Sequence, residues 1–172
     1  NSKSFNRFIV KKGLFVFPAA PALATIEKSD RYYDSLREAD LVFFDSGFFV
    51  LLLRVFKNIN VNKFSGYKFL NLFFDYLKKN KKKKVFCIDP NFKFSQSNKN
   101  LLKSLGVKKI HNYLAPKYQT KSLSDKKLLK KIKKIKPDFI MTNIGGGTQE
   151  VLGLYLKKNL EIKTTILCTG AA

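Results

Sequence analysis

The sequence predicts an α/β fold of the Rossmann-like type, with a mainly parallel sheet and helices on both of its faces. Two observations lead to this prediction. Short apolar runs alternate with helical patterns along the chain, as expected when each strand is joined to the next through a helix. Runs such as LVFF (41–44) and DFIM (138–141) are also apolar without alternation, which is typical of strands buried on both faces.

The first half of the chain is expected to hold two strands and three helices. The apolar run LFVFP predicts a strand at 14–18, and a helical pattern follows at 22–38. ADLVFFD predicts a second strand at 39–45, and the apolar residues after it predict a largely buried helix at 47–56. Apolar residues spaced at i, i+1, i+4, i+5 and i+8 then predict a helix at 66–77.

The second half continues the alternation. KVFCID predicts a strand at 84–89, a short helix is expected at 98–105, and KKIHNYL predicts a strand at 108–114. An amphipathic pattern predicts a helix at 124–135 with Ser124 as its N-cap. The last elements are expected as strand, helix and strand at 138–144, 148–159 and 163–168. Because no linker or internal repeat interrupts this order, we treat residues 1–172 as a single domain.

The charge of the chain points toward anionic partners. Its net charge is +22, with 34 Lys and Arg against 12 Asp and Glu, which favours nucleic acid, anionic lipid or phosphorylated substrates. The alternative is that most lysines are solvated surface, as in the turn at 78–84 and the helix at 126–136. Since the basic runs lack interleaved aromatic residues and no reader motif occurs, we expect no nucleic-acid partner.

The cysteine and histidine content argues against a metal centre. Cys87 and Cys168 lie inside apolar runs, where we expect buried free thiols. With one His and no Cys-x-x-Cys pair, a zinc site built by the protein is not expected. We therefore expect no metal and no cofactor.

The segment NIGGGTQE follows a strand and opens a helix, where an α/β fold places its ligands. Gly145, Gly146 and Gly147 allow close approach of a ligand to the backbone, and the helix amides after them favour an anion such as a diphosphate. Asn143 precedes this turn, and the amide of Gln149 has the chemistry to orient a phosphate or sugar hydroxyl. A tight strand-to-helix turn is the alternative explanation.

Asp45 ends a strongly apolar strand. A carboxylate among phenylalanines is costly unless it caps a helix or faces a ligand. Desolvation there would raise the pKa of Asp45 and make it usable as a general base. Physical reasoning leaves the helix cap and the base equally open.

Other strand ends and turns supply further candidates. Asp89 and Tyr113 lie at the ends of two strands and are candidates for lining a nucleoside pocket. Lys63, Ser65 and Gly66 form a turn before a helix and are candidates for contacts to an acceptor or a phosphate. Ordinary turns and solvated lysines are the alternatives.

Together, the segments ADLVFFDSG, NKFSGYKFL, KPDFIMTNIGGGTQE and CTGAA resemble motifs of the WecG/TagA/CpsF group, glycosyltransferase family 26, in the same order. The resemblance covers about residues 22–172. It implies transfer of a sugar, commonly N-acetylmannosamine, from a UDP-sugar to a lipid-diphosphate-linked saccharide, without a metal. The products of such transferases enter teichoic acid, capsule or enterobacterial surface polysaccharide.

The resemblance also assigns roles. Asp45 matches the proposed catalytic base of an inverting transfer, and Gly145–Gly147, Gln149 and Gly170 match the donor region. It implies a cytoplasmic enzyme that is peripheral on the inner face of a bacterial membrane, with homo-oligomers left open. The chain starts with Asn and ends at CTGAA, so we expect a fragment that lacks the family's C-terminal membrane-docking tail.

The sequence departs from the family pattern at several positions. Phe17-Pro18-Ala19 stands where the family often has Thr-x-Asn, and Lys63 stands for an Arg. These departures put the sugar and the acceptor in question more than the fold. Two alternatives follow: an inactive relative that binds nucleotide-sugars, and a basic nucleic-acid-binding protein.

Overall fold

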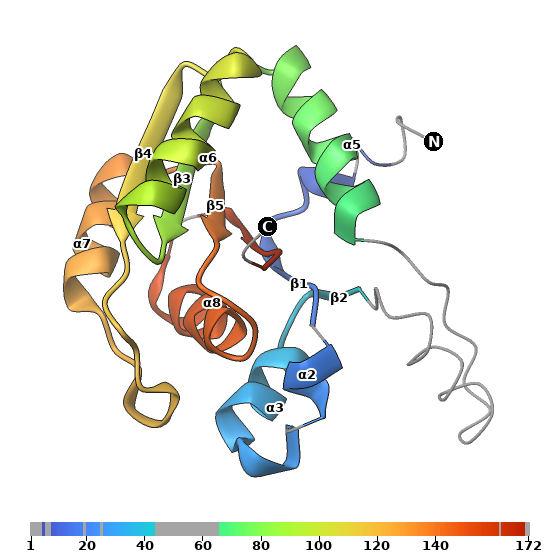
Figure 1. The fold of residues 1–172 in the computed structure, drawn as a ribbon, viewed down its shortest axis with the longest axis vertical. Coiled ribbons are helices and arrows are strands. Elements are labelled where there is room, and N and C mark those ends of the chain that lie inside the picture. The colour runs from blue at the N-terminus through green and yellow to red at the C-terminus, as the bar shows by residue number, and fades with distance from the viewer. Residues whose placement is uncertain are drawn as a thin grey trace.

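The computed structural model describes residues 5, 8–18, 20–24, 26–43, 66–161 and 163–170. A six-stranded sheet has the order β2-β1-β6-β5-β3-β4, and every neighbouring pair of its strands is parallel (Figure 1). This architecture confirms the predicted α/β, Rossmann-like class. The strands are β1 Gly13–Val16, β2 Leu41–Val42, β3 Lys84–Asp89, β4 Lys109–Leu114, β5 Phe139–Thr142 and β6 Thr165–Cys168.

Helices join the strands and cover the sheet (Figure 1). Helices α2 and α3 lie between β1 and β2, α5 precedes β3, and α6, α7 and α8 lead into β4, β5 and β6 in turn. The helices are α2 Ala20–Leu23, α3 Asp30–Arg37, α5 Gly66–Lys79, α6 Phe92–Ser104, α7 Lys126–Ile135 and α8 Thr148–Asn159, with 3-10 turns at Ile26–Lys28 and Thr120–Ser122.

The sheet separates two apolar cores. Alternate strand residues point to opposite faces, so Cys87 of β3 packs on the side of α5 and α6, whereas Phe86 packs on the side of α3, α7 and α8. Phe69 of α5 belongs to the first core, and Ile132 of α7 and Leu152 of α8 belong to the second. Burial on both faces explains why the central strands are apolar without alternation.

Neighbouring strands β3 and β5 send the chain to opposite faces of the sheet. Helix α6, which follows β3, lies with α5 on one face, and α8, which follows β5, lies on the other. Such a topological switch point leaves a crevice at the carboxyl ends of the strands. The fold therefore directs attention to the residues that follow β3, β5 and β6.

Three helices begin elsewhere than the sequence suggested, because local caps set their first turns. The expected helix at 22–38 is divided, since Ser29 caps α3 by accepting a 3.4 Å hydrogen bond from the backbone N–H of Tyr32. The prediction of Ser124 as the cap of α7 was wrong. Asp125 is the cap, and its carboxylate also accepts hydrogen bonds from tyrosine side chains.

The helix expected at 98–105 is α6, which starts earlier, at Phe92. Asn91 caps it by accepting a 3.1 Å hydrogen bond from the backbone N–H of Phe94. The strand expected at 39–45 is observed as the short β2, and its last two residues lie outside the described part of the chain. The helix expected at 47–56 also lies outside it.

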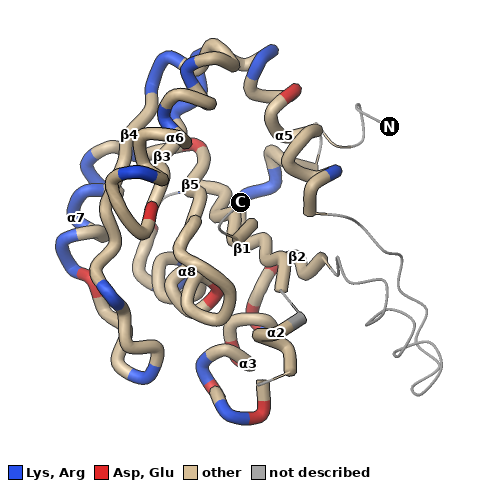
Figure 2. Tube along the Cα trace, in the orientation of Figure 1, with Lys and Arg blue, Asp and Glu red and all other residues tan. Residues whose placement is uncertain are grey.

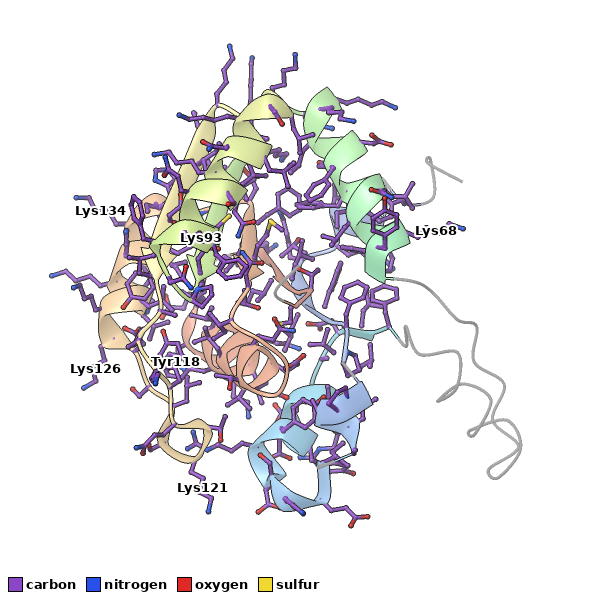
Figure 3. All side chains as sticks on the ribbon, in the orientation of Figure 1. Lys68, Lys93, Tyr118, Lys121, Lys126 and Lys134 are labelled. Atoms are coloured by element: carbon purple, nitrogen blue, oxygen red, sulfur yellow. The ribbon has the colours of Figure 1, made fainter. Side chains whose placement is uncertain are left out.

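Most lysines of α7 face solvent, in agreement with the alternative that these lysines are solvated surface. Leu128 and Ile132 are fully buried, while Lys126 and Lys134 extend outward from the helix (Figure 3). Figure 2 shows basic residues along α7 and again around the turn between α5 and β3. Among the described helices, none is long and apolar enough to cross a membrane. Cys87 and Cys168 are free and buried, which confirms the prediction for both thiols.

Candidate functional site

A pocket of about 260 Å³ lies at the carboxyl ends of β3, β5 and β6, between α5 and α6. Most of its wall is apolar. Tyr67 and Phe74 come from α5, and Phe94 and Leu101 from α6. Asn71, Asn98, Asn143 and Thr169 contribute polar side chains to its lining, and Gly170 contributes backbone. Among the lining residues that the structure describes, none is a lysine or arginine, although the chain is strongly basic.

Asp89, at the end of β3, lies beside this pocket as a fully buried carboxylate. Its Oδ1 accepts hydrogen bonds from Nδ2 of Asn98 at 2.7 Å and from Nδ2 of Asn143 at 2.8 Å. Its Oδ2 accepts a third hydrogen bond, from Nδ2 of Asn112 at 3.0 Å. The ion pairs found in the described part of the chain do not include Asp89. Three neutral amides therefore offset the cost of burying this charge.

The glycine turn lies directly after β5, as the sequence predicted. Gly145 and Gly147 have φ angles of 98° and 83°, a region that side chains strongly disfavour. A Cβ atom added at either glycine would meet nothing within 4 Å, so the turn borders open space. Gly146 is exposed between them. The turn leads into α8, whose first amides point toward the same end of the sheet.

The carboxylate of Glu150 caps the first turn of its own helix, α8. Oε2 of Glu150 accepts a 2.7 Å hydrogen bond from the backbone N–H of Gly147, so the side chain of Glu150 satisfies one amide at the start of the helix. Glu150 is fully buried, and burial raises the pKa of its carboxyl above the usual range. The hydroxyl of Tyr32 is buried nearby, and burial together with the charge of Glu150 raises the pKa of Tyr32. Glu150 thus serves the helix start.

Gln149 links the two glycine-containing strand ends. Its side chain is 1% exposed, and Oε1 accepts a 3.1 Å hydrogen bond from the backbone N–H of Gly170. Its Nε2 donates to Oε1 of Glu150 at 3.1 Å. Gly170 has a φ of 92° and borders both the pocket and open space. Gln149 therefore acts on the shape of the pocket through Gly170.

Tyr113 does not line the pocket. It lies on the edge strand β4, and its hydroxyl donates a 2.8 Å hydrogen bond to Oδ2 of Asp125. The hydroxyl of Tyr118 donates to the same oxygen at 2.7 Å. Burial, followed by the hydrogen bond to Asp125, raises the pKa of Tyr113 to about 12. Tyr113 therefore helps to fix the start of α7.

The structure brings together some of the candidate residues from the sequence and leaves others undetermined. Asn143 and Gly170 line the pocket, Asp89 lies beneath it, and the glycine turn follows the neighbouring strand. Gly66 is the first residue of α5, next to Tyr67 at the pocket. Asp45, Lys63 and Ser65 lie outside the described residues.

Asn98 and Asn112 are site residues that sequence reasoning missed. They come from α6 and β4, so nothing in their local sequence signals that they meet at Asp89. In the part of the chain that the structure describes, His, Cys, Asp and Glu side chains do not gather in threes that could hold a metal ion.

Comparison with known proteins agrees with this geometry at the level of the family. A search of curated proteins finds no match to the chain. The family model described as "Glycosyl transferase WecG/TagA/CpsF family" matches residues 4–172, which is essentially the whole chain. The protein with this parallel sheet and strand-end pocket therefore belongs to the WecG/TagA/CpsF family of glycosyltransferases.

Proposed function

We propose that this glycosyltransferase moves an N-acetylmannosamine-like sugar, with inversion, from a UDP-sugar to a lipid-diphosphate-linked saccharide. The product would enter surface polysaccharide or teichoic acid synthesis. Family membership supports sugar transfer. The nature of the donor and of the acceptor is our proposal, based on the resemblance of the sequence motifs and on the strand-end site.

One observation supports donor binding above the others. Three glycines with positive φ, at positions 145, 147 and 170, follow the adjacent strands β5 and β6 and border open space. The backbone N–H groups of Gly147 and Gly170 already donate to Glu150 and Gln149. Other backbone N–H groups of the turn and of the helix start are suited to phosphate oxygens. We assign the diphosphate of the donor to this pair of turns. No step requires a metal ion in this proposal.

Asp45 is the proposed catalytic base. A carboxylate there would take the proton from the acceptor hydroxyl while the hydroxyl oxygen attacks the anomeric carbon and UDP leaves from the opposite side of the sugar. The glycosidic bond forms as the bond to the diphosphate breaks, which inverts the anomeric centre. The proposal rests on the resemblance around ADLVFFDSG.

A lipid-linked acceptor requires contact with a membrane, and the exposed lysines support an anionic surface as partner. Lys126 and Lys134 extend from α7, and Lys68 and Lys93 from the helices that flank the pocket (Figure 3). Each lysine near an anionic bilayer contributes about 1 kcal/mol of attraction. Co-sedimentation with anionic but not with neutral vesicles is the expected result, and equal behaviour with both would contradict membrane attachment through charge.

The test of the proposed function is a calorimetric titration with UDP at physiological salt, with AMP as the control ligand. Saturable binding of UDP alone, weakened by Gly147→Ala, is the expected result. Equal weak binding of both nucleotides, lost on adding salt, would mean that surface lysines bind the phosphates without a built site. That result would remove the support for a UDP-sugar donor.

A further inference from the structure

The hydroxyl of Tyr32 is an unexplained feature of the core between α3 and α8. The Tyr32 side chain is 3% exposed. In the described part of the chain, its hydroxyl is the one buried side-chain oxygen or nitrogen without a hydrogen-bond partner. A buried donor that stays unpaired costs free energy, so native proteins rarely keep one without a function. We therefore expect the hydroxyl to find its partner in another state of the protein.

The carboxylate of Glu150 is the charged group that acts on Tyr32. Helix α3 packs against α8, and Tyr32 belongs to the same core as Val151, the neighbour of Glu150 on α8. Burial and the negative charge of Glu150 raise the pKa of Tyr32, so the hydroxyl keeps its proton and can donate a hydrogen bond. The ion pairs found among the described residues do not include Glu150. The buried carboxylate therefore depends on neutral donors.

Glu150 occupies a backbone N–H that a bound anion needs. Its Oε2 accepts a 2.7 Å hydrogen bond from the N–H of Gly147, and Gly147 borders open space. A phosphate oxygen that approaches this N–H meets the carboxylate, and two negative charges on one donor repel each other. Phosphate can take the N–H only if Oε2 gives it up. A buried carboxylate that loses one donor then needs another.

We propose that Tyr32 is a positioning residue for the donor: when the diphosphate binds the glycine turn, the carboxylate of Glu150 exchanges the N–H of Gly147 for the hydroxyl of Tyr32. The N–H of Gly147 then donates to the diphosphate, while Nε2 of Gln149 continues to donate to Oε1 of Glu150. The carboxylate keeps two donors in both states, and the hydroxyl is paired only in the bound one. The inference rests on the proposed UDP-sugar donor and adds how the glycine turn is freed for it.

Tyr32→Phe removes the hydroxyl and keeps the ring. Since the hydroxyl makes no hydrogen bond in the free protein, the thermal unfolding temperature should stay the same or rise. UDP should nevertheless bind about three- to tenfold more weakly in calorimetry at physiological salt, because Glu150 lacks its second donor in the bound state. A tyrosine with a purely structural role gives the opposite result, lower stability with unchanged UDP affinity, and that result would overturn the inference.

Tyr155→Phe is the matched control on the same helix as Glu150. The hydroxyl of Tyr155 accepts a 3.1 Å hydrogen bond from the backbone N–H of Asp125, at the start of α7. Its removal should lower the unfolding temperature and leave UDP affinity unchanged. The two tyrosine variants are therefore expected to show opposite patterns of stability and binding. A loss of UDP affinity as large in Tyr155→Phe would overturn the specific role of Tyr32.

Glu150→Gln tests whether Tyr32 acts through the carboxylate. An amide carries no charge, so its repulsion of the diphosphate disappears and the exchange is no longer needed. In the Glu150→Gln background, the loss of UDP affinity caused by Tyr32→Phe should shrink to less than about twofold. An undiminished loss in that background would mean that Tyr32 acts independently of Glu150, which contradicts the inference.

A spectroscopic measurement on the unaltered chain covers the case in which variants at position 150 fail to fold. The chain has seven tyrosines and no tryptophan, so its near-ultraviolet absorbance reports on tyrosine hydroxyls. UDP binding should shift the long-wavelength edge of this absorbance, where uracil absorbs little, as a hydroxyl begins to donate to a carboxylate. The shift should persist in Tyr155→Phe and disappear in Tyr32→Phe. Its absence from the unaltered chain at saturating UDP would overturn the inference.

The possible failures are distinguishable. If UDP binds saturably and Gly147→Ala weakens it, but Tyr32→Phe binds UDP as tightly as the unaltered chain does, the exchange is overturned and the proposed donor stands. If UDP does not bind saturably to the unaltered chain, both the proposed donor and the inference built on it are overturned.

Discussion

The side-chain oxygen of Gln149 accepts a 3.1 Å hydrogen bond from the backbone N–H of Gly170. The bond joins the start of α8 to the segment after β6, across two neighbouring strands. It positions a glycine that lines the pocket without exposing the glutamine itself. The amide thereby shapes the site while staying out of direct contact with solvent.

Replacing Gln149 with alanine should loosen that connection. The backbone N–H of Gly170 and the carboxylate of Glu150 each lose a buried partner, so the free energy of unfolding should fall by about 1–3 kcal/mol. UDP affinity should fall about tenfold because Gly170 is no longer held. Urea unfolding and calorimetric titration measure the two effects. Asn159→Ala, at the exposed end of the same helix, is the control and should leave UDP affinity unchanged.

The glycine turn offers an internal comparison. Gly145→Ala and Gly147→Ala force an alanine to a positive φ angle, so each should lower the free energy of unfolding by about 1–3 kcal/mol and weaken UDP binding. Gly146 is not among the glycines with positive φ, and Gly146→Ala should cost clearly less stability. Thermal unfolding of the three variants checks the order. An equal loss in all three would contradict a conformational role for positions 145 and 147.

The sequence was sufficient to predict the glycine turn and the sheet, because both depend on local patterns. An apolar run followed by glycines marks a strand end wherever it occurs, and the parallel order brings such ends to one edge. The turn at Gly145–Gly147 and the pocket residue Asn143 were found in this way. The cap of α7 was assigned one residue too early because Ser124 and Asp125 are both good N-caps, and only the tertiary contacts of Asp125 decide between them.

The asparagine cluster was beyond sequence reasoning. Asn98, Asn112 and Asn143 come from a helix and from two strand regions, and their meeting depends on the strand order β5-β3-β4. The orientation of the Gln149 side chain could not be predicted either, because a side chain at a helix start can contact either a ligand or a neighbouring loop. Its contact with the loop at Gly170 depends on the position of β6 in the sheet.

Stability should depend on acid pH through Asp138, which lies at the opposite end of the sheet from the pocket. Burial raises the pKa of its carboxyl, but hydrogen bonds from the backbone N–H of Lys84 at 2.9 Å and from the Lys83 ammonium at 3.0 Å outweigh burial and hold the pKa below 3.8. A depressed pKa stabilises the fold above the unfolded value, and this contribution is lost as the pH falls through the folded pKa.

Asp138→Asn should therefore lower the free energy of unfolding by about 1–2 kcal/mol at neutral pH and by a smaller amount at pH 3. Urea unfolding of both proteins across this range measures the difference. UDP binding at neutral pH should be unchanged in the folded variant. A stability difference of the same size at both pH values would contradict the electrostatic explanation.

Asp45→Asn tests the proposed base. An amide cannot take the acceptor proton, so transfer should fall by about 10²- to 10⁴-fold. Folding and UDP affinity should change little, because the residue is assigned to the acceptor step and not to donor binding. The assay measures UDP release from UDP-N-acetylmannosamine in the presence of a lipid-diphosphate saccharide, with calorimetry for UDP affinity.

Asp40→Asn is the matched control for Asp45, since in the sequence Asp40 directly precedes the residues of β2 and Asp45 follows them. Asp40 lies before β2, accepts a 2.7 Å hydrogen bond from the backbone N–H of Leu14 and pairs with Lys157 at 2.8 Å. Its loss should lower stability but leave transfer by the folded protein intact. Because asparagine caps a helix about as well as aspartate does, Asp45→Ala is the variant that tests the cap: a loss of stability in Asp45→Ala, with transfer retained in Asp45→Asn, would instead identify Asp45 as a helix cap. Since a cap affects folding and a base affects turnover, the pair of variants separates the two roles that the sequence left open.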